Sequence, residues 1–166
     1  MTGKPPTVVD LAWGGPPSLD NSTPSFGEAS PPSLDNSRPS VGEARALTFS
    51  VTTHQSSFIL DGHAVAGPSP VEALAAALAG CMSIDVIDIL TKGRHTVRAL
   101  RAHLSAERAP SEPRRFVRAS LHITIEGEVA ASAVERAIAL SREKYCSVWH
   151  SMRQDIELST SYELRA

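Results

Sequence analysis

A long apolar segment in the middle of the chain constrains the fold more than any other feature. It opens on Ser69, Pro70 and Glu72, which suit the N-cap, the first turn and the third position of a helix and together form a capping box. Gly93 suits the stop after the last turn. Apolar residues lie most of the way round the helix between these ends, and such a helix is buried on most sides. We therefore predict a central, buried helix over residues 70–92.

Segments with strand character lie on both sides of this helix. They are short and apolar, and several alternate apolar with polar positions or close on a turn such as Asp61-Gly62. They comprise residues 8–13, 47–51, 58–60, 100–107, 117–125 and 156–164. The order of strands, helix, strands, helices and strand predicts an α+β fold with an antiparallel sheet.

Two further helices are predicted before the last strand. Ser132 and Glu135 form a second capping-box pattern, so we expect a helix over about residues 133–145. Ser147 then suits the cap of a short third helix that ends near Met152.

The N-terminal part of the chain has a different composition. Residues 1–44 are rich in Pro, Ser and Gly, and residues 16–30 are repeated as residues 31–45 with twelve of fifteen positions identical. Two copies with so few large apolar residues do not make a packed repeat, which needs about three units that each bury a face. We expect residues 1–44 to be mostly flexible and residues 45–166 to form the folded domain.

Length, charge and composition exclude several classes of protein. A chain of 166 residues suits one domain, and a net charge of −2 without a basic stripe argues against nucleic-acid binding. Asp85 and Asp88 interrupt the longest apolar stretch, so we expect no membrane span of ~20 residues. The first ten residues lack the apolar run of a signal peptide, and two cysteines are no disulfide framework. The sequence therefore favours a reducing cytoplasm.

The two cysteines are Cys81, in the middle of the predicted central helix, and Cys146, at the end of the next one. The simplest interpretation of Cys81 is a buried cysteine that acts as a small hydrophobe. A reactive Cys81 would need a cation from elsewhere, because the N-terminus of its own helix is roughly 15 Å away. No zinc-type spacing occurs, and Asp85, four residues after Cys81, is only a weak indication of a metal pair. We expect no metal and no cofactor.

Three stretches carry a family resemblance: GPSPVEALAAALAGCMSIDVIDIL with the Lys-Gly-Arg turn after it, SREKYCSV, and the final SYEL. Over about residues 45–166 the chain resembles the OsmC/Ohr family of thiol-dependent peroxidases, most closely its YhfA-like branch. The resemblance implies an OsmC-like fold, with two long central helices enclosed by antiparallel sheets in an intertwined homodimer. A helix that is apolar on every side agrees, since about 120 folded residues do not readily cover it.

The resemblance also implies a reaction. Cys81 would attack an organic hydroperoxide and become a sulfenic acid, and Cys146 would resolve it as a disulfide. A thiol or dithiol reductant would then restore the enzyme, in defence against oxidative stress. Apolar neighbours such as Leu78, Met82 and Trp149 would suit an apolar peroxide.

The chain departs from the family pattern at the groups that activate the thiol. Peroxidases of the family carry a glutamate ten residues before the first cysteine and an arginine in the N-terminal strands. Val71 occupies the first position here, and Glu72 is one residue, or about 100°, out of place. Helix capping is a sufficient role for Glu72. Arg45, which opens the first clear strand, is the best candidate for the arginine, ahead of Arg38.

These departures keep an alternative function open. A non-catalytic member of the family would use the pocket at the dimer interface to bind an apolar ligand or to sense thiol-reactive compounds. The missing carboxylate at Val71 favours this alternative. The histidines suggest no second site, because His103 and His122 occupy the polar faces of their strands, where solvent exposure is expected.

Overall fold

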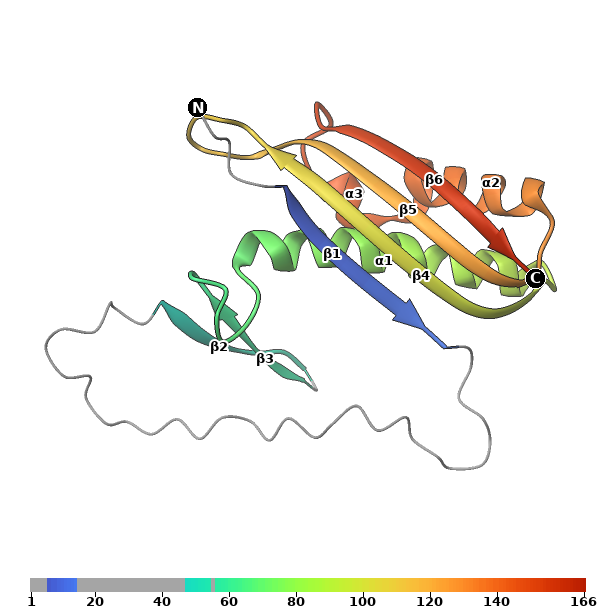
Figure 1. The fold of residues 1–166 in the computed structure, drawn as a ribbon, viewed down its shortest axis with the longest axis horizontal. Coiled ribbons are helices and arrows are strands. Elements are labelled where there is room, and N and C mark those ends of the chain that lie inside the picture. The colour runs from blue at the N-terminus through green and yellow to red at the C-terminus, as the bar shows by residue number, and fades with distance from the viewer. Residues whose placement is uncertain (1–5, 15–46, 55) are drawn as a thin grey trace, which may run out of the picture. The chain divides into compact units, whose positions relative to one another are not determined.

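The computed structural model describes residues 6–14, 47–54 and 56–166, which form two units (Figure 1). One unit contains the first strand and everything from Leu74 onward, and the other contains a hairpin and the start of the long helix. The duplicated segment, and with it the predicted flexibility of the N-terminal region, lies outside the described residues.

The larger unit is built on a four-stranded sheet in the order β1-β4-β5-β6 (Figure 1). These strands are β1 Thr7–Trp13, β4 Thr96–Arg108, β5 Phe116–Glu128 and β6 Glu157–Arg165. The pairs β1/β4 and β4/β5 are antiparallel, as predicted, but β5/β6 is parallel. A parallel pair requires a long crossover, and the helical segment between β5 and β6 supplies it.

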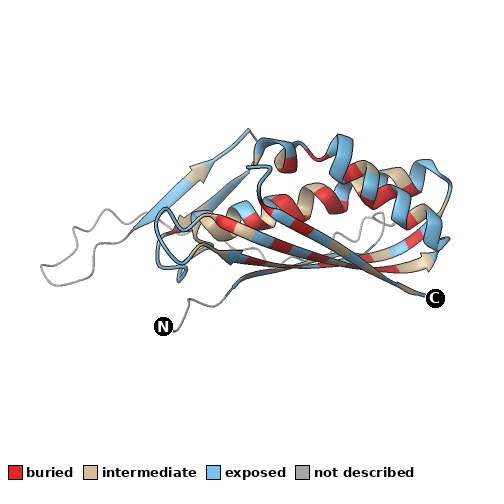
Figure 2. Cartoon of the chain, turned by 90° about the horizontal axis from the view of Figure 1, so that it is seen from above, coloured by how far each residue is buried: buried red, intermediate tan, exposed pale blue. Residues whose placement is uncertain are grey.

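Three helices cover one face of this sheet: α1 Pro70–Lys92, α2 Ala131–Leu140 and α3 Ser147–Ser151 (Figures 1 and 2). The alternation predicted for β4 and β5 is the reason, because every second side chain points to the covered face. The side chains buried there include Leu100, Ala102, Leu104, Ala106, Ala119, Leu121, Ile123 and Ile125. The core therefore lies between the sheet and the helices.

The start of α1 confirms the predicted capping box. The Ser69 N–H and hydroxyl both donate to Glu72 Oε2 at 2.7 Å, and the Glu72 N–H donates to Ser69 Oγ at 3.3 Å. The helix begins at Pro70 and ends at Lys92, as the sequence predicts.

In the smaller unit, β2 Thr48–Thr52 pairs with β3 Ser57–Asp61.

The turn after β3 is organised by the side chain of Asp61. Its carboxylate accepts hydrogen bonds from the backbone N–H groups of His63, Val65 and Ala66. These bonds, led by the one from Ala66, hold the pKa of Asp61 below its usual range. The Asp-Gly signal in the sequence thus marks a turn that the aspartate itself stabilises.

One face of α1 is packed in the core and another is open. The buried residues are Ala75, Leu78, Ala79, Met82, Ser83, Val86 and Leu90. Leu74 and Ile84 are 42% and 68% exposed, so the residues that the structure describes leave this side of the helix uncovered. An 18-residue window of this 23-residue helix has a mean hydropathy of 1.9, so α1 also has the length and composition of a membrane span. The two aspartates therefore do not exclude a span as expected, although a core helix has the same properties.

The structure corrects three predictions for the segment from the start of α2 to the start of α3. Ala130 is the N-cap of α2 and caps it through no side chain, and Glu135 instead accepts a hydrogen bond of 2.8 Å from the Tyr162 hydroxyl on β6. The predicted Ser132–Glu135 capping box is therefore wrong. The long helix expected to Tyr145 is α2 followed by a π-helical turn, Ser141–Tyr145. The N-cap of α3 is Cys146, not Ser147 as predicted.

Candidate functional site

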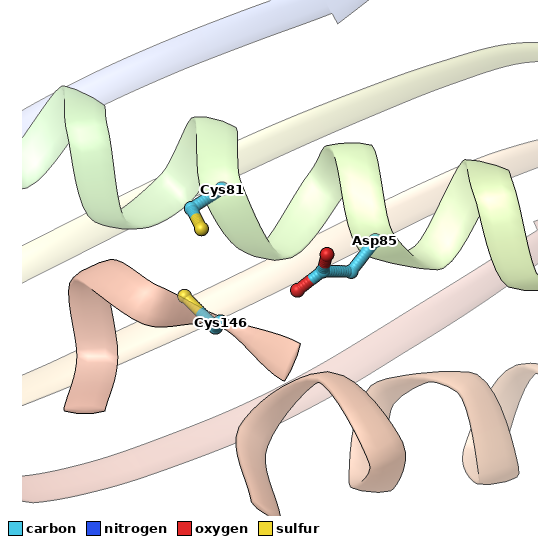
Figure 3. A group of neighbouring side chains, drawn as sticks. All are labelled: Cys81, Asp85 and Cys146. Atoms are coloured by element: carbon cyan, nitrogen blue, oxygen red, sulfur yellow. The ribbon is translucent and has the colours of Figure 1, made fainter. Parts of the chain in front are cut away.

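The fold brings the two cysteines together although they are 65 positions apart in the sequence. Cys81 lies on α1, and Cys146 lies in the bend between the π-helical turn and α3. Both are free thiols. The two sulfurs and a carboxylate oxygen of Asp85 all lie within 4.8 Å of one another, and Figure 3 shows them pointing into the same space.

Backbone geometry holds Cys146 in place. The π-helical turn ends with a hydrogen bond of 2.8 Å from the Cys146 N–H to the Ser141 carbonyl. Cys146 then adopts an extended conformation, and its sulfur accepts a hydrogen bond of 3.4 Å from the Trp149 N–H at the start of α3. The thiol thus occupies the position that Ser or Asp usually takes at an N-cap. Wide turns of this kind are frequent at functional sites.

The two thiols differ in their access to solvent. Cys146 is fully buried, whereas Cys81 is partly exposed. Burial raises the pKa of the Cys146 thiol, and the nearby Cys81 and Asp85 raise it further, against a partial lowering by the Trp149 N–H. Cys146 is therefore a neutral thiol at neutral pH.

Asp85 joins the site from the turn of α1 that follows Cys81. Its Oδ2 accepts a hydrogen bond of 2.7 Å from the hydroxyl of Ser141, which is fully buried. The hydroxyl oxygen of Ser147 lies 4.0 Å from the Cys81 sulfur. The spacing of four residues indicated that Asp85 shares a helix face with Cys81. Nothing in the sequence indicated Ser141, because its position depends on the π-helical turn.

The structure does not bring Glu72, another predicted site residue, to the thiols. Glu72 caps α1 nine residues before Cys81, and at about 100° per residue the two lie on opposite sides of the helix. Arg45 and Arg38 lie outside the described residues. In the described part of the chain, no hydrogen bond or ion pair links Cys81, Asp85 or Cys146 to a lysine or arginine.

The apolar residues expected to line a peroxide pocket have a different role. Leu78, Met82 and Trp149 are at most 5% exposed and belong to the core. The exposed stripe of α1 is formed by Leu74 and Ile84. Cys81 is partly exposed beside it, three residues before Ile84 on the same side of the helix.

His103 and His122 lie outside the thiol site, as the sequence predicts. His103 is half exposed, and its Nδ1 lies 2.7 Å from Asp10 Oδ1 on β1. His122 is its direct partner across β4 and β5, and contacts the Ser161 hydroxyl at 2.9 Å. They form a polar row on the outer face of the sheet.

The chain is similar to known proteins both in sequence and in fold. The family model described as OsmC-like protein matches residues 61–161. Protein YhfA from Escherichia coli K12 is 39% identical over 125 residues, which cover 72% of this chain and 92% of YhfA. The residues that the family model matches therefore include both cysteines, and the YhfA match covers nearly the whole of that relative.

Solved structures share the same architecture. A hypothetical protein from Aquifex aeolicus is 28% identical with a TM-score of 0.67, over 72% of this chain and 88% of that one. The OsmC like protein from Mycoplasma pneumoniae is 15% identical with a TM-score of 0.58, over 74% and 97% of the two chains. The latter is similar in fold alone.

Proposed function

This chain belongs to the OsmC-like protein family, and from that premise we propose that it is a thiol peroxidase acting on organic hydroperoxides, with Cys81 as the attacking thiol and Cys146 as the resolving thiol. One observation carries the proposal: the two sulfurs, remote in sequence, lie within 4.8 Å of each other. A disulfide joins its two sulfurs at about 2.05 Å, so the proposal requires the two thiols to close the remaining gap.

Burial supports this assignment of roles. The attacking thiol must meet the substrate, and only Cys81 is partly exposed. The resolving thiol acts later, on a sulfenic acid that is already in the protein, so it can be buried. The raised pKa of Cys146 keeps it protonated and makes it a poor first nucleophile.

The reaction balances with the groups present. The Cys81 thiolate attacks the terminal oxygen of the hydroperoxide, the O–O bond breaks, and an alcohol leaves after taking up one proton. Cys81 is then a sulfenic acid. The sulfur of Cys146 then attacks the Cys81 sulfur and displaces the hydroxyl of the sulfenic acid. The hydroxyl leaves as water with the Cys146 proton, and a Cys81–Cys146 disulfide forms. A thiol or dithiol reductant returns both cysteines to the reduced state.

The open stripe of α1 beside Cys81 supports an apolar substrate and a second chain. Ile84 is 68% exposed and Leu74 is 42% exposed, which is unusual for large apolar residues on a core helix. We propose that the same stripe of a partner chain covers it in a homodimer, as the family fold implies, and that the peroxide reaches Cys81 at this boundary.

The Cys81 thiolate still requires a cation. Asp85, the charged residue beside the two sulfurs, works against a thiolate. Arg45, at the opening of the strand predicted from the sequence, remains our candidate for this cation. We expect Arg45→Ala to slow the first reduction step while both thiols stay titratable in the denatured protein.

A non-catalytic role is the second candidate, and Val71 favours it. The carboxylate of the peroxidases is absent there, and Glu72 caps the helix on the opposite side from Cys81. In that case the stripe beside Cys81 would bind an apolar ligand or sense thiol-reactive compounds without turnover.

Thiol counting separates the two functions. The reduced protein is treated with one equivalent of cumene hydroperoxide, and free thiols are counted after denaturation. A peroxidase loses both thiols and forms one disulfide within the chain. Cys146→Ser should trap a Cys81 sulfenic acid that dimedone labels, and Cys81→Ser should consume no peroxide. If the wild-type protein keeps both thiols during prolonged exposure to excess organic hydroperoxide, the binding role replaces the enzyme.

A further inference from the structure

Three groups that bind metals meet at the thiol site. Cys81 and Asp85 are four residues apart on α1 and point to one side of the helix, as in Figure 3. Cys146 comes from a different element and completes the triangle. Two ligands one helical turn apart, joined by a third from elsewhere in the chain, is the arrangement of many zinc sites with three protein ligands.

The distances suit a small tetrahedral ion. The two sulfurs and the carboxylate oxygen lie within 4.8 Å of one another. Zinc binds sulfur at ~2.3 Å and carboxylate oxygen at ~2.0 Å, so its ligand atoms lie roughly 3.3–3.8 Å apart. Binding a zinc ion requires the triangle to close by about 1 Å through adjustment of the three side chains.

Two of the three groups are already oriented by hydrogen bonds. The buried Ser141 hydroxyl holds the Asp85 carboxylate at 2.7 Å and leaves its other oxygen for a ligand. The Trp149 N–H holds the Cys146 sulfur at 3.4 Å. Contacts of this kind around metal sites fix the ligands and raise their affinity.

The charge of the cluster also calls for a cation. Two thiolates and a carboxylate would carry three negative charges in a partly buried space. In the residues that the structure describes, neither a lysine nor an arginine bonds to any of them. A divalent metal ion bound by both thiolates would offset two of these three charges.

We propose that Cys81, Asp85 and Cys146 bind one zinc ion when both cysteines are reduced, with the fourth position open to solvent on the exposed side of Cys81. Thiolate ligands favour zinc over magnesium or calcium, and a mixed sulfur and oxygen set with three protein ligands fits its tetrahedral preference. The proposal goes beyond the peroxidase function and rests on the geometry of the reduced pair alone.

Binding of this kind is coupled to the redox state of the pair. Zinc displaces one proton from each thiol as it binds. A hydroperoxide and two protons then convert the zinc dithiolate into a disulfide, a free zinc ion, an alcohol and water. The two electrons that reduce the peroxide come from the two sulfurs. The site therefore holds zinc only in the reduced protein and releases it on oxidation.

Zinc or cobalt titration of the full-length reduced chain, without oxygen or peroxide, tests the proposal. We expect one ion per chain by competition with a colorimetric chelator, and a sulfur-to-cobalt charge-transfer band with Co²⁺. Cys81→Ser and Cys146→Ser should each remove the band. Asp85→Asn should weaken zinc binding, and Ser141→Ala should weaken it by ~10-fold through loss of its hold on Asp85.

Matched controls separate this site from adventitious binding. Asp88→Asn changes an exposed aspartate on the same helix that pairs with Lys92, and should bind zinc as wild type does. His103→Ala tests the outer face of the sheet. Circular dichroism of each variant shows that it is folded, and Asp85→Glu should recover part of the affinity.

Three results would overturn the proposal. The first two are a reduced wild-type chain that binds no zinc and binding that survives both cysteine variants. Pre-formed disulfide should bind none, and undiminished binding by the oxidised protein would count against it equally. Because no peroxide is used, a chain that binds zinc but leaves peroxide untouched supports this site and refutes only the peroxidase. A chain that reduces peroxide but binds no zinc refutes only this site.

Discussion

Cys81 and Cys146 are the same residue type in two contrasting regions of one site. Cys81 sits in a regular helix, partly exposed, beside an apolar stripe that this chain leaves open. Cys146 sits where a helix breaks, fully buried, with its sulfur bonded to a backbone N–H. The two thiols therefore differ in exposure and hydrogen bonding because their surroundings differ. A substitution can alter the environment of one thiol and leave that of the other unchanged.

The largest expected effect concerns the open side of the Cys81 region. Ile84→Glu places a charge in the stripe that we propose a second chain covers, and burying an unpaired charge is very costly. Sedimentation should then change from about twice 17.7 kDa to the mass of one chain or to an unfolded protein. Val8→Glu, at a 47% exposed position on β1, is the control and should remain dimeric. A dimeric Ile84→Glu would remove the stripe from the interface.

Alkylation compares the two thiols directly. In the native, metal-free protein, iodoacetamide should modify Cys81 at least ~10-fold faster than Cys146, which is buried and protonated. Peptide mass spectrometry measures both rates in one sample. In denaturant the rates should converge, which shows that the difference comes from the fold. Equal rates in the native protein would contradict the contrast.

Stability should show the same asymmetry on a smaller scale. Cys146→Ser places a hydroxyl in a fully buried position and should lower the free energy of unfolding by about 1–3 kcal/mol. Cys81→Ser, at a partly exposed position, should cost about 0.5 kcal/mol or less. Urea denaturation under reducing conditions with a chelator measures both. A larger loss for Cys81→Ser would reverse the comparison.

The pH dependence is the smallest effect. Because the pKa of Cys146 is raised in the folded protein, the unfolded chain loses that proton first as pH rises above about 8.5. The folded state then holds more protons, so its stability falls with pH, by at most ~1.4 kcal/mol per pH unit. Cys146→Ala should flatten the fall measured above pH 9 in chelator. An unchanged slope would show that Cys146 does not contribute.

Much of the fold could be predicted, because its signals are local. The Ser69–Glu72 capping box and the alternation along β4 and β5 depend on residues a few positions apart, and both are confirmed. The Ser132–Glu135 pattern is equally local but was wrong, because Tyr162 on β6 takes up the Glu135 carboxylate. A contact from a distant strand thus outweighed a helix cap.

The site could be predicted only in part. The family motifs identified Cys81 and Cys146, and helical spacing put Asp85 near Cys81. The role of Ser141 could not be predicted, because a single π-helical turn directs its hydroxyl to Asp85, and such turns have no clear sequence signature.

The sequence by itself determined which segments become helix and strand, since capping, alternation and turn residues act through neighbouring backbone groups. Only the tertiary structure decided that Cys146 is buried whereas Cys81 is partly exposed. It also decided that a carboxylate oxygen of Asp85 lies within 4.8 Å of both sulfurs. The physical reason is that burial and electrostatic coupling depend on what surrounds a group in space. Here those surroundings come from segments that are 65 residues apart along the chain.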